Sequence, residues 1–265
     1  MLSMTGFAMN APLRRSLLNG HSSNPLVRKL EGLAPLSEAD RSILDQLAAG
    51  ARLADPHVDL IREGSAPDAA FLVLKGIACR YKHRQDGKRQ ILSYLLPGDL
   101  CDPDIAHLSR IDHALGTLSA CSVARIPREA LLFAVERHPN VAQAFRRAKI
   151  VEEAVTREWL VNLGCRSAIE RIAHLFCELL LRLQAVGFAE NDSFEFPVTQ
   201  VELGDTTGLS NVHVNRTLQE LRRQGLIATG QRRLIILDLP RLRALAEFQA
   251  GYLQPAVGTD LCTAH

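Results

Sequence analysis

The sequence lacks the features that mark a membrane protein or an enzyme with a familiar motif. None of its apolar runs approaches the roughly 20 residues that a helix needs to cross a bilayer. It has no glycine-rich phosphate loop, and no Ser-His-Asp or Cys-His arrangement in a recognisable local context. We therefore expect a protein with no membrane partner and no enzymatic activity.

Cysteines are few and scattered. Six of them occur, without a C-x-x-C pair or a tight cluster, and no export signal precedes them. This pattern favours reduced thiols and a cytoplasmic location. Cys121 in a strand-like run and Cys177 on an apolar helix face are interpreted as small hydrophobic residues.

Composition permits a nucleic-acid partner without demanding one. The 265 residues suffice for two domains, and 47% of them are apolar, as in ordinary globular proteins. The net charge of +2 is modest, whereas domains that bind duplexes often have a pI above about 9. Residues 1–23 are rich in Gly, Ser and Asn, and we expect them to form a flexible tail.

The most informative stretch is 199–227, which predicts two short helices joined by a tight turn. Thr199 and Glu202 have the spacing of a capping box, Gly208 interrupts the helical pattern, and Ser210 restarts it as a second N-cap. In the second helix, a buried stripe is predicted at Val214, Leu218 and Leu221. The opposite face then carries Val212, Arg216, Gln219 and Arg223. Two arginines one heptad apart on that face suit the major groove of double-stranded DNA.

Upstream, the sequence predicts a helical segment followed by short strands. Residues 24–49 look helical, whereas 51–126 show strand-length runs separated by glycine turns, of which Asp86-Gly87 is the strongest hairpin signal. Regular spacing of such strands predicts an antiparallel β-roll of the jelly-roll or double-stranded β-helix kind. Pro127 is expected as the first residue of a helix that runs to about Glu136.

A long helix is predicted from Pro139 to about Leu163, with Gly164 ending it. Its small apolar residues recur at spacings of four, three and four, a seam that suits a partner helix. The alternative is an amphipathic helix packed on its own β-domain, and we favour pairing. The seam consists of Ala144, Ala148, Val151 and Val155.

A further helix is expected over 166–186, and residues 187–195 are interpreted as a polar linker. After the helix-turn-helix, 226–237 predicts a short β-hairpin, or wing, and 240–252 a terminal helix. The fold class is therefore α+β. Its predicted parts are the tail (1–23), a β-roll domain (24–138), a dimerisation helix (139–164), a winged helix-turn-helix domain (165–240) and a C-terminal extension (241–265).

This order of parts resembles the Crp/Fnr superfamily of bacterial transcription regulators over roughly residues 24–240. The motifs that carry the resemblance are Gly98-Asp-Leu100, the run 120–126 that leads into a helix, and the pattern of glycines and apolar residues over 208–227. The resemblance implies a cyclic-nucleotide-binding-like β-roll and a homodimer paired through the long helix. It also implies a palindromic promoter site and a contact with RNA polymerase.

The recognition helix departs from the family at Val212, where many members carry Glu. Valine cannot accept a hydrogen bond from cytosine but can contact a thymine methyl group, whereas Arg216 matches the family and suits guanine O6 and N7. The predicted DNA-binding residues are Thr199, Ser210, Asn211, Val212, His213, Arg216, Gln219, Arg223, Arg232 and Arg233.

The effector is harder to predict. Family members that bind cyclic AMP place Glu where this chain has Asp99, and an Arg-Ser or Arg-Thr pair near Ile111-Asp112. Cyclic AMP is therefore disfavoured, because Asp112 would repel a phosphate. An N-terminal iron–sulfur cluster is disfavoured too, since no cysteine precedes Cys79.

Cys101, Asp102, Asp104, His107 and Asp112-His113 gather potential metal or haem ligands in one loop region. Their spacing matches no established motif, so a solvated loop is favoured and no metal residue is assigned. Haem, a metal or an exposed thiol switch at Cys101 stay open, as does a sensing module in which DNA contact is secondary. Asp99, Cys101, Asp102 and His107 are the candidate effector-pocket residues.

The segment 80–89, RYKHRQDGKR, is strongly basic. A solvated turn is favoured, and a contact with RNA polymerase or with flanking DNA is the alternative.

Overall fold

The structure is a computed structural model that describes residues 22–66, 68–102 and 109–254. The predicted tail (1–23) therefore lies almost entirely outside the described residues, as do residues 255–265 of the C-terminal extension. Within the described residues, none of the helices combines the length and the apolar character that a bilayer crossing requires.

Two short helices open the described chain, and both begin at a side-chain cap. α2 (Pro25–Glu31) begins after Asn24, whose side chain accepts a hydrogen bond from the Leu26 amide (2.9 Å). α3 (Glu38–Ala48) begins with a complete capping box between Ser37 and Asp40. The helical character predicted for 24–49 is therefore confirmed.

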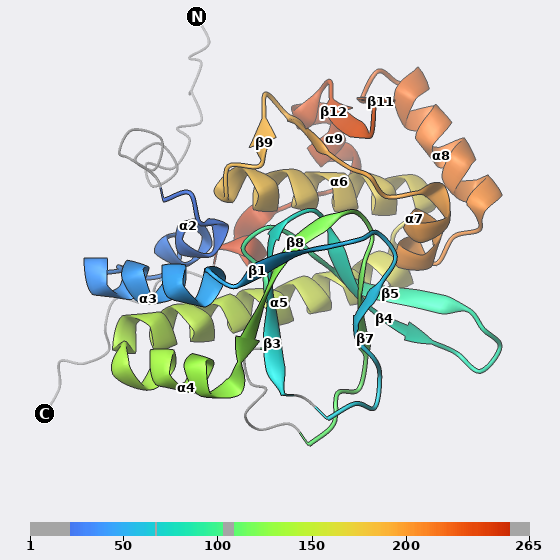
Figure 1. Ribbon diagram of the computed structural model, residues 1–265. Helices are drawn as coiled ribbons and strands as arrows, with labels where there is room; N and C mark the ends of the chain where they lie inside the picture. The colour runs from blue at the N-terminus through green and yellow to red at the C-terminus, as the bar shows by residue number, and fades with distance from the viewer. Residues whose placement is uncertain (1–21, 67, 103–108, 255–265) are drawn as a thin grey trace, which may run out of the picture.

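The β-roll consists of two four-stranded antiparallel sheets (Figure 1). One has the strand order β1-β8-β3-β6 and the other β2-β7-β4-β5. Between the sheets, a small apolar cluster includes Val73, Leu95 and Leu115. The strands are β1 (Ala51–Ala54), β2 (Asp59–Ile61), β3 (Ala69–Lys75), β4 (Ala78–His83), β5 (Arg89–Leu95), β6 (Leu100–Cys101), β7 (Ala114–Thr117) and β8 (Cys121–Pro127).

Three helices follow the roll, with small differences from the predicted boundaries. Pro127 ends β8 and is the N-cap of α4 (Arg128–Arg137) rather than its first residue. α5 (Pro139–Cys165) continues through Gly164, so its predicted end at that residue is one residue short. α6 (Ala168–Ala185) begins after Ser167, which forms a capping box with Glu170. α5 and α6 run across the middle of the molecule in Figure 1.

The C-terminal part is a helix-turn-helix with a four-stranded sheet. The sheet order is β11-β12-β10-β9, so two strands from the region interpreted as a polar linker extend the wing. That interpretation is wrong because Phe194 points into the core and is fully buried. The elements are β9 (Ala189–Glu190), β10 (Ser193–Glu195), α7 (Gln200–Thr207), α8 (Asn211–Arg223), β11 (Ile227–Gly230), β12 (Arg233–Ile236), α9 (Leu239–Leu245) and the 3₁₀ helix η2 (Ala250–Leu253).

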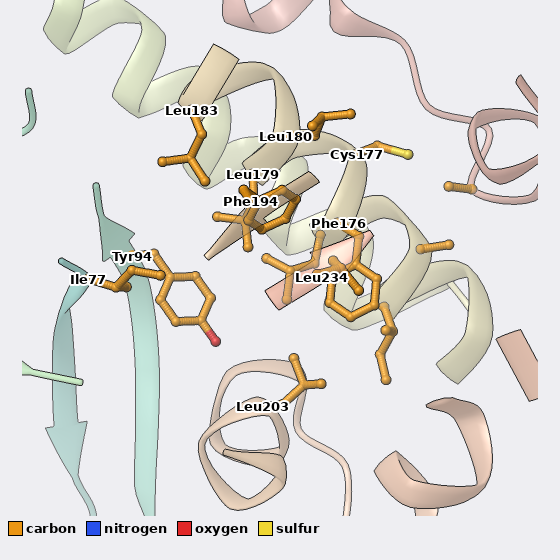
Figure 2. Close-up of a cluster of buried hydrophobic side chains, with 14 of the residues drawn as sticks. Ile77, Tyr94, Phe176, Cys177, Leu179, Leu180, Leu183, Phe194, Leu203 and Leu234 are labelled. Atoms are coloured by element: carbon orange, nitrogen blue, oxygen red, sulfur yellow. The ribbon is translucent and has the colours of Figure 1, made fainter. Parts of the chain in front are cut away.

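One apolar cluster continues from the β-roll into the helix-turn-helix. It contains Ile77 and Tyr94 from the roll, Phe176 from α6, Leu203 from α7 and Leu234 from the wing (Figure 2). Val155 and Trp159 of α5 belong to the same cluster. The predicted sensor and DNA-binding parts therefore share a core.

The predicted pairing seam of α5 faces its own chain. Ala144 is fully buried and Val155 is 7% exposed, while Ala148 and Val151 pack against the two largest apolar clusters. The alternative of an amphipathic helix packed on its own domain describes this face correctly. Ala144 and Val155 are thus covered by their own chain, whereas Ala148 and Val151 are partly exposed, so pairing through the whole seam stays a prediction.

An ion-pair cluster around Asp99 joins three elements. Its carboxylate lies 2.7 Å from Arg182 Nη2 of α6 and also pairs with Lys29 of α2, and it accepts a hydrogen bond from the Leu96 amide (2.7 Å). Burial raises the pKa of Asp99, but the charges of Lys29 and Arg182 outweigh it and lower the pKa to about 2. Asp99 is thus part of a structural ion-pair cluster, and its place in an effector pocket stays a prediction.

We predict that Asp99→Asn destabilises the protein by about 3 kcal/mol at pH 7, because it removes the charge that balances Lys29 and Arg182. The folded-state pKa lies below the unfolded value of about 3.9, so this stabilisation is present above about pH 4 and is lost as the pH falls toward 2. Urea unfolding at several pH values measures both effects. An equally steep acid loss in the wild type and the variant would contradict the assignment.

Candidate nucleic-acid interface

The first helix of the helix-turn-helix begins with the capping box that the sequence predicted. The Thr199 side chain accepts a hydrogen bond from the Glu202 amide (3.2 Å), and Glu202 Oε2 accepts from the Thr199 amide (2.7 Å). Glu202 is buried and its other oxygen lies 3.4 Å from His57 Nδ1 in the loop between β1 and β2. The start of α7 is therefore fixed both locally and against the β-roll.

The turn between α7 and α8 depends on two glycines. Gly208 has φ +69°, a left-handed conformation that suits glycine at the end of a helix. A Cβ on Gly204 would lie 2.7 Å from the Leu209 carbonyl oxygen, so the chain passes too close for a side chain there. The two helices are consequently held at a short, fixed separation.

Arg171 of α6 holds this turn against the end of α5. Its guanidinium donates to the carbonyl oxygens of Asn162 (2.9 Å) and Leu163 (3.1 Å) in the last turn of α5, and to the Thr207 carbonyl at the end of α7. A cation beside carbonyls at helix C-termini is stabilised by the helix dipoles. The orientation of the helix-turn-helix is thereby coupled to the long helix.

The predicted buried stripe and exposed face of α8 are both present. The helix begins at Ser210, whose side chain accepts from the His213 amide (3.3 Å), and Val214, Leu218 and Leu221 are buried. In Figure 1, α8 lies at the periphery of the molecule, away from α3 and α4. Its exposed residues include Asn211, Val212, His213, Arg216, Gln219 and Arg223.

The two arginines of this face differ in their surroundings. Arg216 is exposed and forms no hydrogen bond or ion pair with the described part of the chain. Arg223 forms a two-pronged ion pair with Glu220, with distances of 2.8 and 2.7 Å. Arg216 is therefore available to a ligand directly, whereas Arg223 must first leave Glu220.

A groove adjoins this face, and one side of it is formed by residues of α6 that were not predicted to lie beside α8. The N-terminus of α6 contributes Ser167, Ala168 and Ile169, opposite Val212 and Arg216 of α8. Amides at a helix N-terminus favour anions, while the Glu170 carboxylate of the capping box offsets part of that effect here. The capping-box spacing of Ser167 and Glu170 could have shown that a helix begins there, but only the fold brings it beside α8. The remaining lining residues are Ser210, His213, Thr217 and Glu220.

The wing places two more arginines near the interface. Arg232 is exposed at the tip of the hairpin, where its φ is 60°. The guanidinium of Arg233 donates to Ser193 Oγ of β10 (3.0 Å). Arg232 is thus freer to reach a ligand than Arg233.

The predicted effector residues have different surroundings from those expected. Cys101 is fully buried, Asp102 has a side chain 13% exposed, and His113 is also buried, so these residues do not form a solvated loop. His107 lies outside the described residues. Burial raises the pKa of the Cys101 thiol even though Arg80 opposes it, which contradicts an exposed thiol switch.

The two ends of the basic segment 80–89 contact other elements of the chain. Arg80 points inward and pairs with Glu152 of α5, and Arg89 lies 2.8 Å from Asp205 of α7. Tyr94 Oη and Thr206 Oγ1 are 2.6 Å apart and add to this docking of α7 on β5. The solvated-turn interpretation therefore holds at the tip, where Arg84 and Lys88 are exposed, and not at the ends.

The chain is similar to known regulators in both of its parts. Residues 170–245 match a family model described as a Crp-like helix-turn-helix domain, and residues 52–138 match one described as a cyclic nucleotide-binding domain. It is 31% identical over 188 residues to the transcriptional activator protein FnrL of Cereibacter sphaeroides, which covers 69% of this chain and 75% of the relative. It is 32% identical over 178 residues to the nitrogen fixation regulation protein FixK of Bradyrhizobium diazoefficiens, covering 66% and 73% of the two chains.

A solved structure supports the same architecture. The structure of FixK2 from Bradyrhizobium japonicum has a TM-score of 0.66 at 24% identity and covers 74% of this chain and 96% of that one. The predicted fold class is confirmed by this likeness. The expectation of a regulator rather than an enzyme is confirmed by the relatives, which are named as transcriptional activators and regulators.

We predict that Gly204→Ala destabilises the protein by about 1–3 kcal/mol, because the added Cβ forces α7 away from the turn. Gly164→Ala is the matched control, since no atom lies within 4 Å of its Cβ position and alanine is the better helix former. Urea unfolding followed by circular dichroism compares the two. A Gly204→Ala protein as stable as the control variant would show that the turn tolerates a side chain.

Proposed function

Because the chain belongs to the Crp/Fnr family of DNA-binding transcription regulators, we propose that it binds a palindromic promoter site as a homodimer. The observation that carries the proposal is the exposed polar face of α8 above a fully buried stripe. One recognition helix reaches few base edges. Two helices on half-sites about 34–36 Å apart supply the remaining specificity.

Within each half-site, α8 enters the major groove and reads bases near its N-terminus. Arg216 has no competing partner in the described residues and donates to O6 and N7 of a guanine. Val212, 66% exposed, contacts a thymine methyl group. Asn211, His213 and Gln219 are placed to reach neighbouring base edges.

The phosphate backbone is held around this helix by a second set of groups. The N-terminus of α6 lies across the groove from α8, and the hairpin tip of the wing carries further arginines. These contacts position the protein without reading sequence. The proposed backbone contacts are Thr199, Ser210, Arg223, Arg232 and Arg233.

The homodimer forms through the outer face of α5. Because Ala144 and Val155 of the predicted seam are buried in the chain's own core, the exposed side of the same helix is the better candidate for the pairing surface. Ile150 is 51%, Leu160 67% and Val161 45% exposed. A spacing of eleven residues places Ile150 and Val161 within about 20° of one another around the helix, and Leu160 lies about 80° to one side of Ile150. Exposed apolar residues along a 27-residue helix favour a partner helix.

The proposal also includes a contact with RNA polymerase and a cytoplasmic location. The hairpin between β4 and β5 projects from the roll in Figure 1, and its tip carries exposed Arg84 and Lys88. Such a tip suits an acidic surface of the polymerase. A regulator of this kind works in the bacterial cytoplasm, where the chromosome lies.

Arg216→Ala and Arg232→Ala separate base reading from backbone contact. We predict that Arg216→Ala costs about 1–3 kcal/mol on the selected site and relaxes specificity at one position. Arg232→Ala weakens all duplexes similarly and lowers the salt slope by about 1. Binding selections from random DNA, followed by salt titrations, measure both. Equal losses on selected and random DNA for Arg216→Ala reject its role as a base reader.

For the dimer, we predict that Ile150→Glu combined with Leu160→Glu converts the protein to a monomer at micromolar concentration, because two carboxylates would be buried in the helix pair. Leu53→Glu is the control, since Leu53 is 90% exposed on β1 of the roll. Sedimentation velocity at several concentrations gives the mass. A double variant that stays dimeric places the interface elsewhere.

A further inference from the structure

Three side chains of metal-ligating type meet inside the β-roll. Cys101 at the end of β6, Asp102 beside it and His113 just before β7 each offer one ligand atom, and these atoms lie within 4.8 Å of one another. The His113 and Asp102 side chains are 9% and 13% exposed, and Cys101 is fully buried. The cluster is distinct from the DNA interface on α8.

Two of the three spacings between ligand atoms are close to those of a tetrahedral site, and the third is no longer than 4.8 Å. Cys101 Sγ lies 3.2 Å from Asp102 Oδ2, and His113 Nε2 lies 3.3 Å from the same oxygen. Metal–ligand bonds of about 2.0–2.3 Å place neighbouring ligand atoms about 3.3–3.8 Å apart around a tetrahedral ion. The residues therefore need to move little to share one ion.

The orientation of His113 is the second observation that points to a ligand. Its Nδ1 lies 3.0 Å from Asp112 Oδ1, so a proton on Nδ1 is held by that carboxylate. Its Nε2 is buried and lies 3.3 Å from Asp102 Oδ2, and it has no well-aligned hydrogen-bond partner in the described residues. A carboxylate that orients a histidine while the other ring nitrogen binds an ion is a common arrangement in metal sites.

We propose that Cys101, Asp102 and His113 bind a divalent transition metal ion of the zinc, cobalt or ferrous class. Sulfur and imidazole ligands favour these ions over magnesium and calcium, which prefer oxygen. Three protein ligands leave a fourth position for water or a small ligand. Binding converts the Cys101 thiol to a metal thiolate and releases its proton to solvent.

Arg80 links this site to the long helix. Its Nη2 lies 3.5 Å from Asp102 Oδ1, and its Nη1 pairs with Glu152 of α5. A metal ion on Asp102 competes with Arg80 for that carboxylate and repels its guanidinium, so the Arg80–Glu152 contact changes with occupancy. This second step rests on the proposed function, because α5 carries the proposed dimer surface.

Anaerobic titration of the full-length protein with cobalt(II) tests the site without DNA. We expect one ion per chain, a thiolate-to-cobalt charge-transfer band and visible bands typical of four-coordination. Cys101→Ser should abolish the charge-transfer band, and His113→Gln should weaken binding at least about tenfold. Cys121→Ser and His138→Gln are matched controls, since Cys121 is also buried and His138 also pairs with an aspartate, Asp40.

Several outcomes decide the proposal. A charge-transfer band that persists in Cys101→Ser, or no saturable binding by the wild type, overturns it. If Cys101→Ser does not fold by circular dichroism, wild-type stoichiometry and the His113→Gln titration decide instead. Equal binding by His113→Gln and the wild type also overturns it, and indicates that the cluster is a protonated histidine ion pair.

Zinc-dependent DNA affinity tests the link through Arg80. We expect saturating zinc to change the affinity of the wild type at least about fivefold for its selected site, and to leave Glu152→Gln less responsive. Unchanged affinity in a protein that shows the cobalt spectrum overturns the link alone. Absence of DNA binding with and without zinc counts against the proposed function, while the metal titration stands independently.

Discussion

The position of the recognition helix depends on one continuous apolar core. Val214, Leu218 and Leu221 of α8 pack in the same cluster as Phe176 of α6 and Tyr94 of the β-roll. Burying such side chains contributes about 1.5–3 kcal/mol each, which is more than exposed polar contacts supply. Because this cluster also includes Val155 and Trp159 of α5, a shift of the long helix relative to the roll cannot leave the helix-turn-helix unaffected.

Polar contacts fix the positions of the elements around that core relative to one another. Asp99 connects α2 and α6 to the roll, Arg89 connects β5 to α7, and Arg171 connects α6 to the ends of α5 and α7. Charged partners with fixed geometry specify an arrangement that apolar packing alone would leave adjustable. The structure therefore offers a physical connection from the β-roll to the exposed face of α8, and that connection passes through packed side chains rather than a flexible linker.

Local patterns in the sequence predicted the helix-turn-helix well. The caps at Thr199 and Ser210, the turn at Gly208 and the buried stripe are set by interactions within about ten residues, so spacing alone reveals them. Short strands such as β9 and β10 carry too few residues to show a period, and their pairing with β12 is decided by the tertiary fold.

Long-range contacts determine the surroundings of the remaining predicted residues, and spacing alone does not reveal them. Ala144 and Val155 have the spacing of a helix pair, but the roll and α6 cover that face of α5. Asp99 occupies a position that the resemblance linked to ligand binding, but Lys29 and Arg182 from distant segments take up its charge. The sequence grouped Cys101 with His113, but their burial inside the roll depends on a strand arrangement that no local spacing encodes.

The central claim is that α8 enters the major groove of two symmetric half-sites. Methylation interference on a selected duplex tests it directly, because dimethyl sulfate methylates guanine N7 in the major groove. The account predicts that methylation of a guanine at two positions related by two-fold symmetry, about one helical turn apart, blocks binding. Interference at a single position, or none in the major groove, would contradict it.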